Sequence, residues 1–182
     1  MPDSEAAGYP AAVSPIWSIR TARLVLTPVS FADLSDLQAI KSDPRVFAIM
    51  LGGVRTHSQT AEELAEDINF WGARGYGLWT VREVDTHHFQ GITGFMDRAD
   101  GRGVALRFAL WPESRGRGLA REAAGAALQF GHERAGLKRI VAIAREDNFA
   151  SRTVLGAIGM HEAERFIQNG YAMLLYESVR GE

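Results

Sequence analysis

The most informative segment of the chain for its fold is Leu110-Trp111-Pro112-Glu113-Ser114-Arg115-Gly116-Arg117-Gly118-Leu119-Ala120. The segment before it, Gly103–Leu110, carries apolar side chains at every second residue, which is the period of a strand. Helical spacing of apolar residues begins directly after it. The first N–H groups of a helix have no partner within the helix, and the helix dipole adds positive potential at that end. The stretch therefore predicts a strand–turn–helix corner that suits an anion such as phosphate.

Glycine and arginine residues give this turn further features of an anion site. Gly116 and Gly118 have no Cβ, so an anion can approach the main chain closely. Positive charge is added by Arg115, Arg117 and Arg121, the last two expected on one helix face. A Walker loop is excluded because no Gly-Lys-Ser/Thr is present, and a dinucleotide fingerprint is disfavoured because Arg121 stands where a third small residue is needed. An ordinary glycine-rich turn with solvated arginines stays open as the alternative.

Two polar residues are expected to lie close to this turn. Ile140–Ala144 is apolar on both faces, as in a covered parallel strand. A predicted helix of about residues 117–134 separates it from Gly103–Leu110, so the two strands should be parallel with a right-handed crossover. Asn148 and Ser151 follow the second strand, and ligands bind at the edge where parallel strands end. A simple helix cap at Asn148 and a first-turn serine at Ser151 are the simpler alternative.

The remaining pattern predicts a mixed α/β (α+β) fold. Before the corner we expect a strand, a helix capped by Ser30, a second helix capped by Thr60 with Glu63, and two more strands; the strands are Leu24–Thr27, Leu78–Glu83 and His88–Met96. After it we expect a short helix at about Ala150–Ile158 and two strands, Met160–Ile167 and Tyr171–Glu177, joined at Asn169-Gly170. The result is a mostly antiparallel central sheet of about seven strands with helices on both faces.

Bulk composition narrows the class of protein. The 182 residues fit one domain, expected over residues 19–182, with a flexible arm over residues 1–18. The net charge of −2 is unlike that of a nucleic-acid-binding domain. No apolar run approaches the roughly 18 residues that span a membrane, and there is no cysteine for a thiol nucleophile or a Cys-ligated zinc. We expect a cytoplasmic protein with neither nucleic acid nor membrane as partner.

Two spaced motifs give the chain a resemblance to a known family. They are Arg115-Gly116-Arg117-Gly118-Leu119-Ala120-Arg121-Glu122-Ala123 and Asn148-x-x-Ser151-x-x-Val154-Leu155-x-x-Ile158-Gly159-Met160. Together they look like the GCN5-related N-acetyltransferase (GNAT) superfamily. Within it the chain most resembles the ribosomal-protein N-terminal acetyltransferase (Rim-type) branch, whose opening strand is similar to Thr21–Leu26. The resemblance covers about residues 20–178.

This resemblance implies an acetyl-CoA site and a role for each matching residue. The CoA pyrophosphate would be held by the backbone amides of Arg115, Gly116, Arg117, Gly118, Leu119 and Ala120. The strand residues Phe108, Ala109 and Leu110 would splay away from Ile140–Ala144 and pair with the pantetheine arm. Asn148 would hydrogen-bond that arm, and Ser151 would donate a proton to the leaving thiolate. No metal is implied.

The chain departs from the family pattern at three positions. Glu113 replaces a glutamine or arginine, Ala105 stands where many members carry glutamate, and Ala172 stands where many Rim-type members carry aspartate. The general base is therefore unassigned. Four carboxylates remain as candidates, namely Asp97, Asp100, Glu162 and Glu164; direct attack with water relaying the proton is the other possibility. Arg107 is expected to meet a neighbouring carboxylate rather than an acidic group of the substrate.

Three functions follow from these motifs. The first is an N-acetyltransferase that moves an acetyl group from acetyl-CoA to a primary amine of a small molecule or a protein N-terminus. The second, suggested by the missing acidic residues, is a non-catalytic acyl-CoA-binding or regulatory domain. The third is a module that binds another phosphate compound at the same turn. A homodimer is an open possibility, because members of the superfamily often pair.

Overall fold

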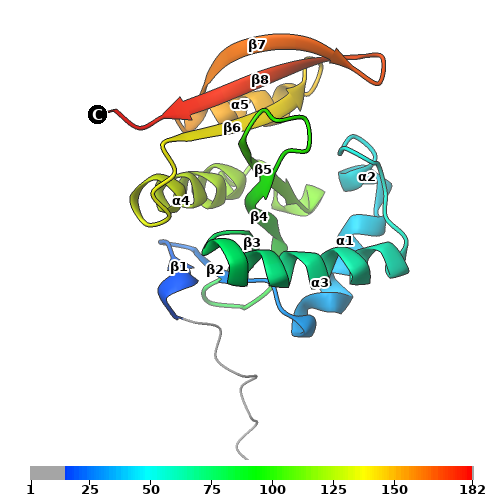
Figure 1. Cartoon of the computed structure of the whole chain (residues 1–182). Coiled ribbons are helices and arrows are strands. Elements are labelled where there is room, and N and C mark those ends of the chain that lie inside the picture. Colours follow the sequence, from blue (N-terminus) through cyan, green and yellow to red (C-terminus); the bar gives the residue numbers. More distant parts are fainter. Residues whose placement is uncertain (1–14, 182) are drawn as a thin grey trace, which may run out of the picture.

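The strands of the protein form one eight-stranded mixed sheet in the computed structural model, which describes residues 15–181 (Figure 1). The strand order is β1-β2-β3-β4-β5-β6-β8-β7. The strands are β1 (Ile19–Arg20), β2 (Leu24–Pro28), β3 (Leu78–Glu83), β4 (Phe89–Asp97), β5 (Val104–Leu110), β6 (Arg139–Arg145), β7 (His161–Gln168) and β8 (Tyr171–Val179). Every neighbouring pair is antiparallel except β5 and β6, which are parallel. The predicted fold class is confirmed; β1, only two residues long, is the strand beyond the expected seven.

Four of the five helices in residues 15–181 connect these strands in the predicted order, with shifts at their ends; α2, which begins at Pro44, was not predicted. The helices are α1 (Leu34–Ser42), α2 (Pro44–Phe47), α3 (His57–Arg74), α4 (Leu119–Glu133) and α5 (Phe149–Ala157), with 3-10 turns η1 (Pro15–Trp17), η2 (Phe31–Asp33) and η3 (Pro112–Ser114). The predicted cap of α3 at Thr60 is wrong. The helix starts one turn earlier, where Thr56 and Gln59 form the capping box and Thr60 is fully buried.

Helices cover both faces of the sheet. On one face, Gly131 of α4 lies so close to Phe95 and Ile140 that an added Cβ would come within 2.6 Å of the phenylalanine ring. On the other face, α3 places Asp67 against Arg107 of β5, at 3.2 Å. Because side chains alternate along β5, its even-numbered residues pack toward α4 and Arg107 points toward α3.

The expected N-terminal arm lies mostly outside the described residues, which begin at Pro15. The part that is described packs onto the domain. Trp17 lies 5.3 Å from the ring of Trp71, and its carbonyl accepts a 2.7 Å hydrogen bond from the indole of Trp79. Trp71 and Trp79 are themselves buried, so the start of the described chain is part of the core.

The hairpin between β7 and β8 has the geometry that its sequence predicts. Asn169 and Gly170 both have positive φ, 52° and 80°. A two-residue loop of this kind matches the right-handed twist of the strands that it joins. The hairpin therefore holds the end of β7 and the start of β8 in a fixed position beside the cavity described below.

A buried ion cluster fixes the loop between α2 and α3. Lys41 is 1% exposed, and its ammonium lies 2.7 Å from Glu63. The second oxygen of Glu63 accepts a 2.6 Å hydrogen bond from Arg55, whose guanidinium also donates to the carbonyls of Leu51 and Gly53. Burial lowers the pKa of Lys41, against the opposing effect of Glu63. Glu63 therefore compensates a buried cation and positions the loop through Arg55.

We predict that Glu63→Ala lowers the free energy of unfolding by about 3 kcal/mol, because it leaves the Lys41 charge buried without its partner. Burial holds the pKa of Lys41 below its ordinary value, so a higher pH lets the ammonium lose its proton. The loss of unfolding free energy caused by Glu63→Ala should therefore become smaller as the pH rises. Denaturant unfolding at several pH values measures both effects. Glu62→Ala, at the exposed neighbouring position, is the control and should stay within about 0.5 kcal/mol of the parent. Equal losses in the two variants would contradict the account.

Candidate functional site

A cavity of about 380 Å³ opens where β5 and β6 part. The two strands share a single pair of register partners, Ala105 and Val141. Beyond it, β5 follows β4 and β6 follows β8, so the main chain of each strand faces the gap without a strand partner. Leu106, Phe108 and the β6 residues 142–145 line the cavity. The predicted splay of this strand pair is therefore a feature of the structure.

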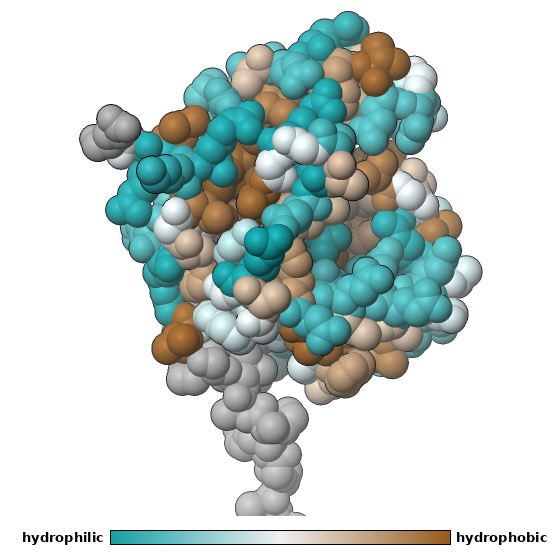
Figure 2. Space-filling view, in the orientation of Figure 1, coloured by the Kyte–Doolittle hydropathy of each residue, from teal (hydrophilic) through white to brown (hydrophobic). Residues whose placement is uncertain are grey.

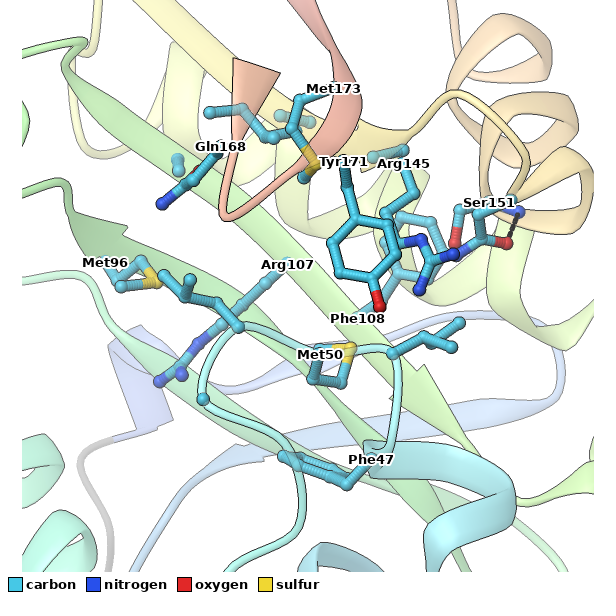
Figure 3. A pocket seen from close by; sticks show the side chains of 18 of the residues that line it. Phe47, Met50, Met96, Arg107, Phe108, Arg145, Ser151, Gln168, Tyr171 and Met173 are labelled. Atoms are coloured by element: carbon cyan, nitrogen blue, oxygen red, sulfur yellow. Dashed lines mark hydrogen bonds between the residues drawn. The ribbon is translucent and has the colours of Figure 1, made fainter.

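Segments that are far apart in the sequence close the cavity. In the close view, Phe47 and Met50 come from α2 and the loop after it, and Gln168, Tyr171 and Met173 come from the β7–β8 hairpin (Figure 3). In the space-filling view, a hollow lies between the part of the surface formed by β7 and β8 and the part formed by α2 and α3 (Figure 2). The cavity is thus open to solvent, and its lining combines apolar side chains with polar and charged ones.

Asn148 and Ser151 both line this cavity, at the end of α5 nearest to β6. Asn148 is the N-cap of α5, and its side-chain oxygen accepts a 3.2 Å hydrogen bond from the N–H of Ser151. The amide NH₂ of Asn148 and the hydroxyl of Ser151 have no protein partner among the described residues. Asn148 is therefore a helix cap, as the simpler alternative had it, and it also leaves two donors for a ligand.

The glycine turn presents a run of unpaired N–H groups. Gly116 and Gly118 have φ of 74°, a conformation that glycine adopts without strain, and Gly118 is the N-cap of α4. Within residues 15–181, none of the N–H groups of residues 116–121 makes a hydrogen bond of good geometry to a protein acceptor. The Arg115 N–H differs, because it donates to the Pro112 carbonyl at 3.1 Å. The unpaired donors therefore begin at Gly116.

The start of α4 differs from its prediction. The helix begins at Leu119, so Arg117 lies in the turn and does not share a helix face with Arg121. The Arg117 guanidinium pairs with Glu83 of β3 at 2.6 Å. The physical reason is the left-handed backbone of Gly118, which starts the helix only after it. By contrast, Arg115 and Arg121 are exposed and have no acidic partner in the described part of the chain.

Side chains from β4 and from the turn between β1 and β2 hold the glycine turn in place. On its N-terminal side, the buried Ser114 hydroxyl donates a 2.5 Å hydrogen bond to Gln90 of β4. On its C-terminal side, Arg23 donates to the Arg117 carbonyl at 2.7 Å and to Glu122 at 2.7 Å. Burial alone would raise the pKa of Glu122, but hydrogen bonds from Thr21 and Arg23 outweigh it and hold the pKa below the ordinary value. The turn is therefore formed in advance of any ligand.

A second, shallower hollow of about 490 Å³ adjoins the turn. Gly118, Arg121 and Gly125 line it from the turn and α4. Arg23, just before β2, and Ile158, the C-cap of α5, line its other side. Gly125 has no side chain to fill the space, and a Cβ there would lie 3.5 Å from Ile158. The hollow is continuous with the unpaired N–H groups, so an extended anionic ligand has room beside them.

None of the four candidate bases lines the cavity. Each is paired with an arginine elsewhere on the surface: Asp97 with Arg74, Asp100 with Arg98 and Arg102, Glu162 with Arg152, and Glu164 with Arg102. Hydrogen bonds from Arg98 hold the pKa of Asp100 well below its usual range, which makes that carboxylate a weak base. Within residues 15–181 the cavity lining contains no aspartate or glutamate.

Several lining residues were not predicted from the sequence. They come from the loop after α2, the end of β6 and the β7–β8 hairpin, and include Met50, Arg55, Arg145 and Tyr171. The guanidinium of Arg145 lies 3.9 Å from the centre of the Tyr171 ring. No local pattern marked these residues, because the cavity brings them together across the sheet. Arg107 also lines the cavity. It pairs with Asp67, which is the contact with a neighbouring carboxylate that was expected from the sequence.

Comparison with known proteins identifies the family. The family described as "Acetyltransferase (GNAT) domain" matches residues 23–161. The chain belongs to this GNAT acetyltransferase family. Its structure is similar to that of a GNAT-family acetyltransferase from Bordetella pertussis, with 26% identity, a TM-score of 0.77, and coverage of 88% of this chain and 98% of that one.

Two more distant structures share the fold. An acetyltransferase from Agrobacterium tumefaciens is 23% identical, with a TM-score of 0.78 and coverage of 98% of this chain and 100% of the other. A RimL ribosomal alpha-N-protein acetyltransferase, solved in complex with coenzyme A, is 16% identical, with a TM-score of 0.74 and coverage of 89% and 97%. The Rim-type proteins thus lie among the structural neighbours, as the resemblance implied.

Two further classes of feature are absent from the described residues. No group of three or more His, Cys, Asp or Glu side chains in residues 15–181 is arranged to hold a metal ion. In the same part of the chain, no helix combines the length and the apolar character needed to cross a bilayer.

We predict that Gly116→Ala weakens CoA binding roughly tenfold or more. The new methyl group would crowd the approach of the diphosphate to the turn, and the loss of one hydrogen bond to a charged group costs about 1.5–3 kcal/mol. Gly136→Ala is a matched control: Gly136 also has a positive φ, and its Cβ would also meet nothing within 4 Å. Both variants should lose about 1 kcal/mol of stability. Calorimetric titration with CoA distinguishes them, and an equal loss of affinity in both would contradict the assignment.

Proposed function

We propose that this protein is an N-acetyltransferase that moves an acetyl group from acetyl-CoA to a primary amine of a small molecule or a protein N-terminus. Membership of the GNAT acetyltransferase family supports acetyl transfer. The observation that carries the proposal is the geometry of the corner. The unpaired N–H groups, which begin at Gly116, lie on one side of the end of β5. The cavity between β5 and β6 lies on the other side.

The turn and the strands fit the two halves of acetyl-CoA. The N–H groups of residues 116–120, with Arg115 and Arg121 beside them, suit a pyrophosphate. The free main-chain edge of Phe108–Leu110 suits the amide groups of the pantetheine arm, and the NH₂ group of Asn148 can donate to the same arm. The arm then points into the cavity, where the Ser151 hydroxyl is available.

Acetyl-CoA supplies an activated thioester, and the protein orients it for attack by the amine. The amine nitrogen forms a bond to the acyl carbon and loses a proton to water, and the carbon–sulfur bond breaks. Ser151 donates its hydroxyl proton to the departing sulfur and regains a proton from water. A main-chain N–H on the free edge of β5 can stabilise the negative charge that develops on the acyl oxygen.

Without a carboxylate in the cavity, the acceptor amine must arrive neutral or lose its proton to water. An N-terminal amine with a pKa of about 8 is neutral more often at pH 7 than a lysine-like amine with a pKa of about 10. The cavity arginines favour the neutral amine, because they repel an ammonium ion. Water is therefore the proton acceptor in this proposal.

Replacement of the serine tests the acid role. We predict that Ser151→Ala lowers kcat about 100-fold and leaves the KM for acetyl-CoA within a factor of about two, because the hydroxyl acts on the leaving group. Thr153→Ala is the control on the same helix, since its hydroxyl donates to the Phe149 carbonyl and does not line the cavity. Steady-state kinetics with release of free CoA provides the measurement, and an unchanged kcat in Ser151→Ala would rule out this role.

The absence of a base in the cavity predicts a particular pH dependence. We expect kcat/KM to rise with pH up to the pKa of the acceptor amine, and the plateau to move when an acceptor with a pKa of about 8 replaces one of about 10. Rate profiles for both acceptors measure this. An inflection at one fixed pH for every acceptor would show a base on the protein instead.

The alternative function is a non-catalytic acyl-CoA-binding domain, which the carboxylate-free cavity favours. It predicts that CoA raises the melting temperature while no amine in a broad panel releases CoA from acetyl-CoA. Comparison of CoA with other phosphate compounds tests the third function, in which the turn binds a different ligand. If ATP or NAD stabilised the protein and CoA did not, both CoA-based functions would be wrong.

A further inference from the structure

The charged residues in the cavity are of one sign. Its lining contains four arginines and, among the described residues, no acidic side chain; the arginines are Arg55, Arg98, Arg107 and Arg145. Three of them are held by carboxylates that lie outside the lining: Arg55 by Glu63 at 2.6 Å, Arg98 by Asp100 at 2.6 Å and Arg145 by Asp147 at 2.7 Å. The cations therefore face the cavity and their counter-ions face away from it.

Arg107 is the least satisfied of the four. Only its Nη2 meets a carboxylate, Asp67, at the rather long distance of 3.2 Å. Its Nε is buried and has no hydrogen-bond partner. Its Nη1 has no protein acceptor in the described chain either, and it is not among the fully buried atoms. Arg107 thus presents donors at the cavity wall that no protein group uses.

The surroundings of Arg107 carry an excess of positive charge. The cluster behind the cavity holds three cations and two carboxylates: Lys41, Arg55 and Arg107 against Glu63 and Asp67. Burial raises the pKa of Asp67, even with Arg107 and Lys41 nearby. Glu66, on the same helix, is exposed to solvent, which screens its charge. A partly buried excess cation is unfavourable unless an anion joins it.

The walls beside Arg107 are apolar. Phe47, Met50 and Met96 line the same part of the cavity, where Figure 3 places them around Arg107. Methionine side chains adapt their shape to a ligand. This part of the cavity therefore offers a cationic group next to a flexible apolar surface.

We propose that Arg107 binds a carboxylate of the acceptor, so that the preferred substrate is an amine that carries a carboxylate and an apolar side chain. The proposal rests on the acetyltransferase function above and names its substrate class. A free apolar amino acid supplies this chemistry directly, and a peptide N-terminus followed by an acidic residue supplies it from another source. Polyamines lack the anion and would meet the four arginines unfavourably.

Matched acceptors test the proposal. Phenylalanine and methionine are compared with phenylalaninamide and methioninamide, in which a neutral carboxamide replaces the carboxylate. Two tripeptide amides, Ser-Asp-Phe and Ser-Asn-Phe, test the peptide source, and spermidine tests a polycation. We expect kcat/KM, corrected for the neutral fraction of each amine, to favour the carboxylate of at least one matched pair by tenfold or more, and spermidine to be the poorest acceptor.

Substitutions of Arg107 test whether this residue causes the preference for acceptors with a carboxylate. Arg107→Gln should reduce the carboxylate preference to about one, mainly by raising the KM of the acceptor, and leave the CoA dissociation constant unchanged. Arg107→Lys should restore part of the preference, because it keeps the charge. Arg74→Gln is the control, since it removes an arginine–aspartate pair, that of Arg74 with Asp97, outside the cavity. The carboxylate preference of this variant should equal that of the parent.

The outcomes separate this proposal from the proposed function. Acetyl transfer to carboxylates and carboxamides at equal rates, or a preference that survives Arg107→Gln, would overturn the substrate class and leave the acetyltransferase in place. If no amine were acetylated, titration of the CoA complex with N-acetylphenylalanine and with N-acetylphenylalaninamide would still decide. Tighter binding of the acid, lost in Arg107→Gln, would support the anion site, and equal binding would overturn it.

Discussion

The divergence of β5 from β6 is the constraint on which the rest of the structure depends. Each of these strands is paired along its length with an antiparallel neighbour, and the two share only the pair Ala105 and Val141. Because a strand follows the partner with which it makes most hydrogen bonds, the two halves of the sheet turn away from each other. The gap exposes main-chain donors and acceptors inside the molecule, which only a ligand with amide groups of its own could pair as a strand would.

The same divergence divides the site into two chemically different sides. On the α4 side, a preformed turn offers N–H groups and two unpaired arginines to a phosphate. On the α3 side, Arg107 and its buried neighbours form a cationic wall beside apolar side chains. Ser151 and Asn148 lie at the end of α5 nearest to β6, where the two sides meet. The chemistry that we propose needs both sides, since one holds the acyl donor and the other positions the amine.

Local patterns in the sequence could predict one of these sides and not the other. Gly116, Gly118, Asn148 and Ser151 were found because each reflects the backbone at its own position. The ion pair of Arg117 with Glu83 could not be predicted from the sequence. It depends on the left-handed backbone of Gly118 and on a strand 34 residues away. The pair of Arg107 with Asp67 spans 40 residues. Long-range charge pairs leave no periodicity in a sequence, so the acceptor side of the cavity emerged only from the structure.

The central claim is that unpaired main-chain donors at the start of α4 bind the diphosphate of CoA. An NMR titration of the labelled protein with CoA tests it most directly, because each backbone amide reports on its own hydrogen bond. We expect the largest amide shifts at Gly116 to Arg121, smaller shifts along Phe108–Leu110, and no shift at the amide of Gly136. Saturable binding that left the amides of Gly116 to Arg121 unshifted would contradict it.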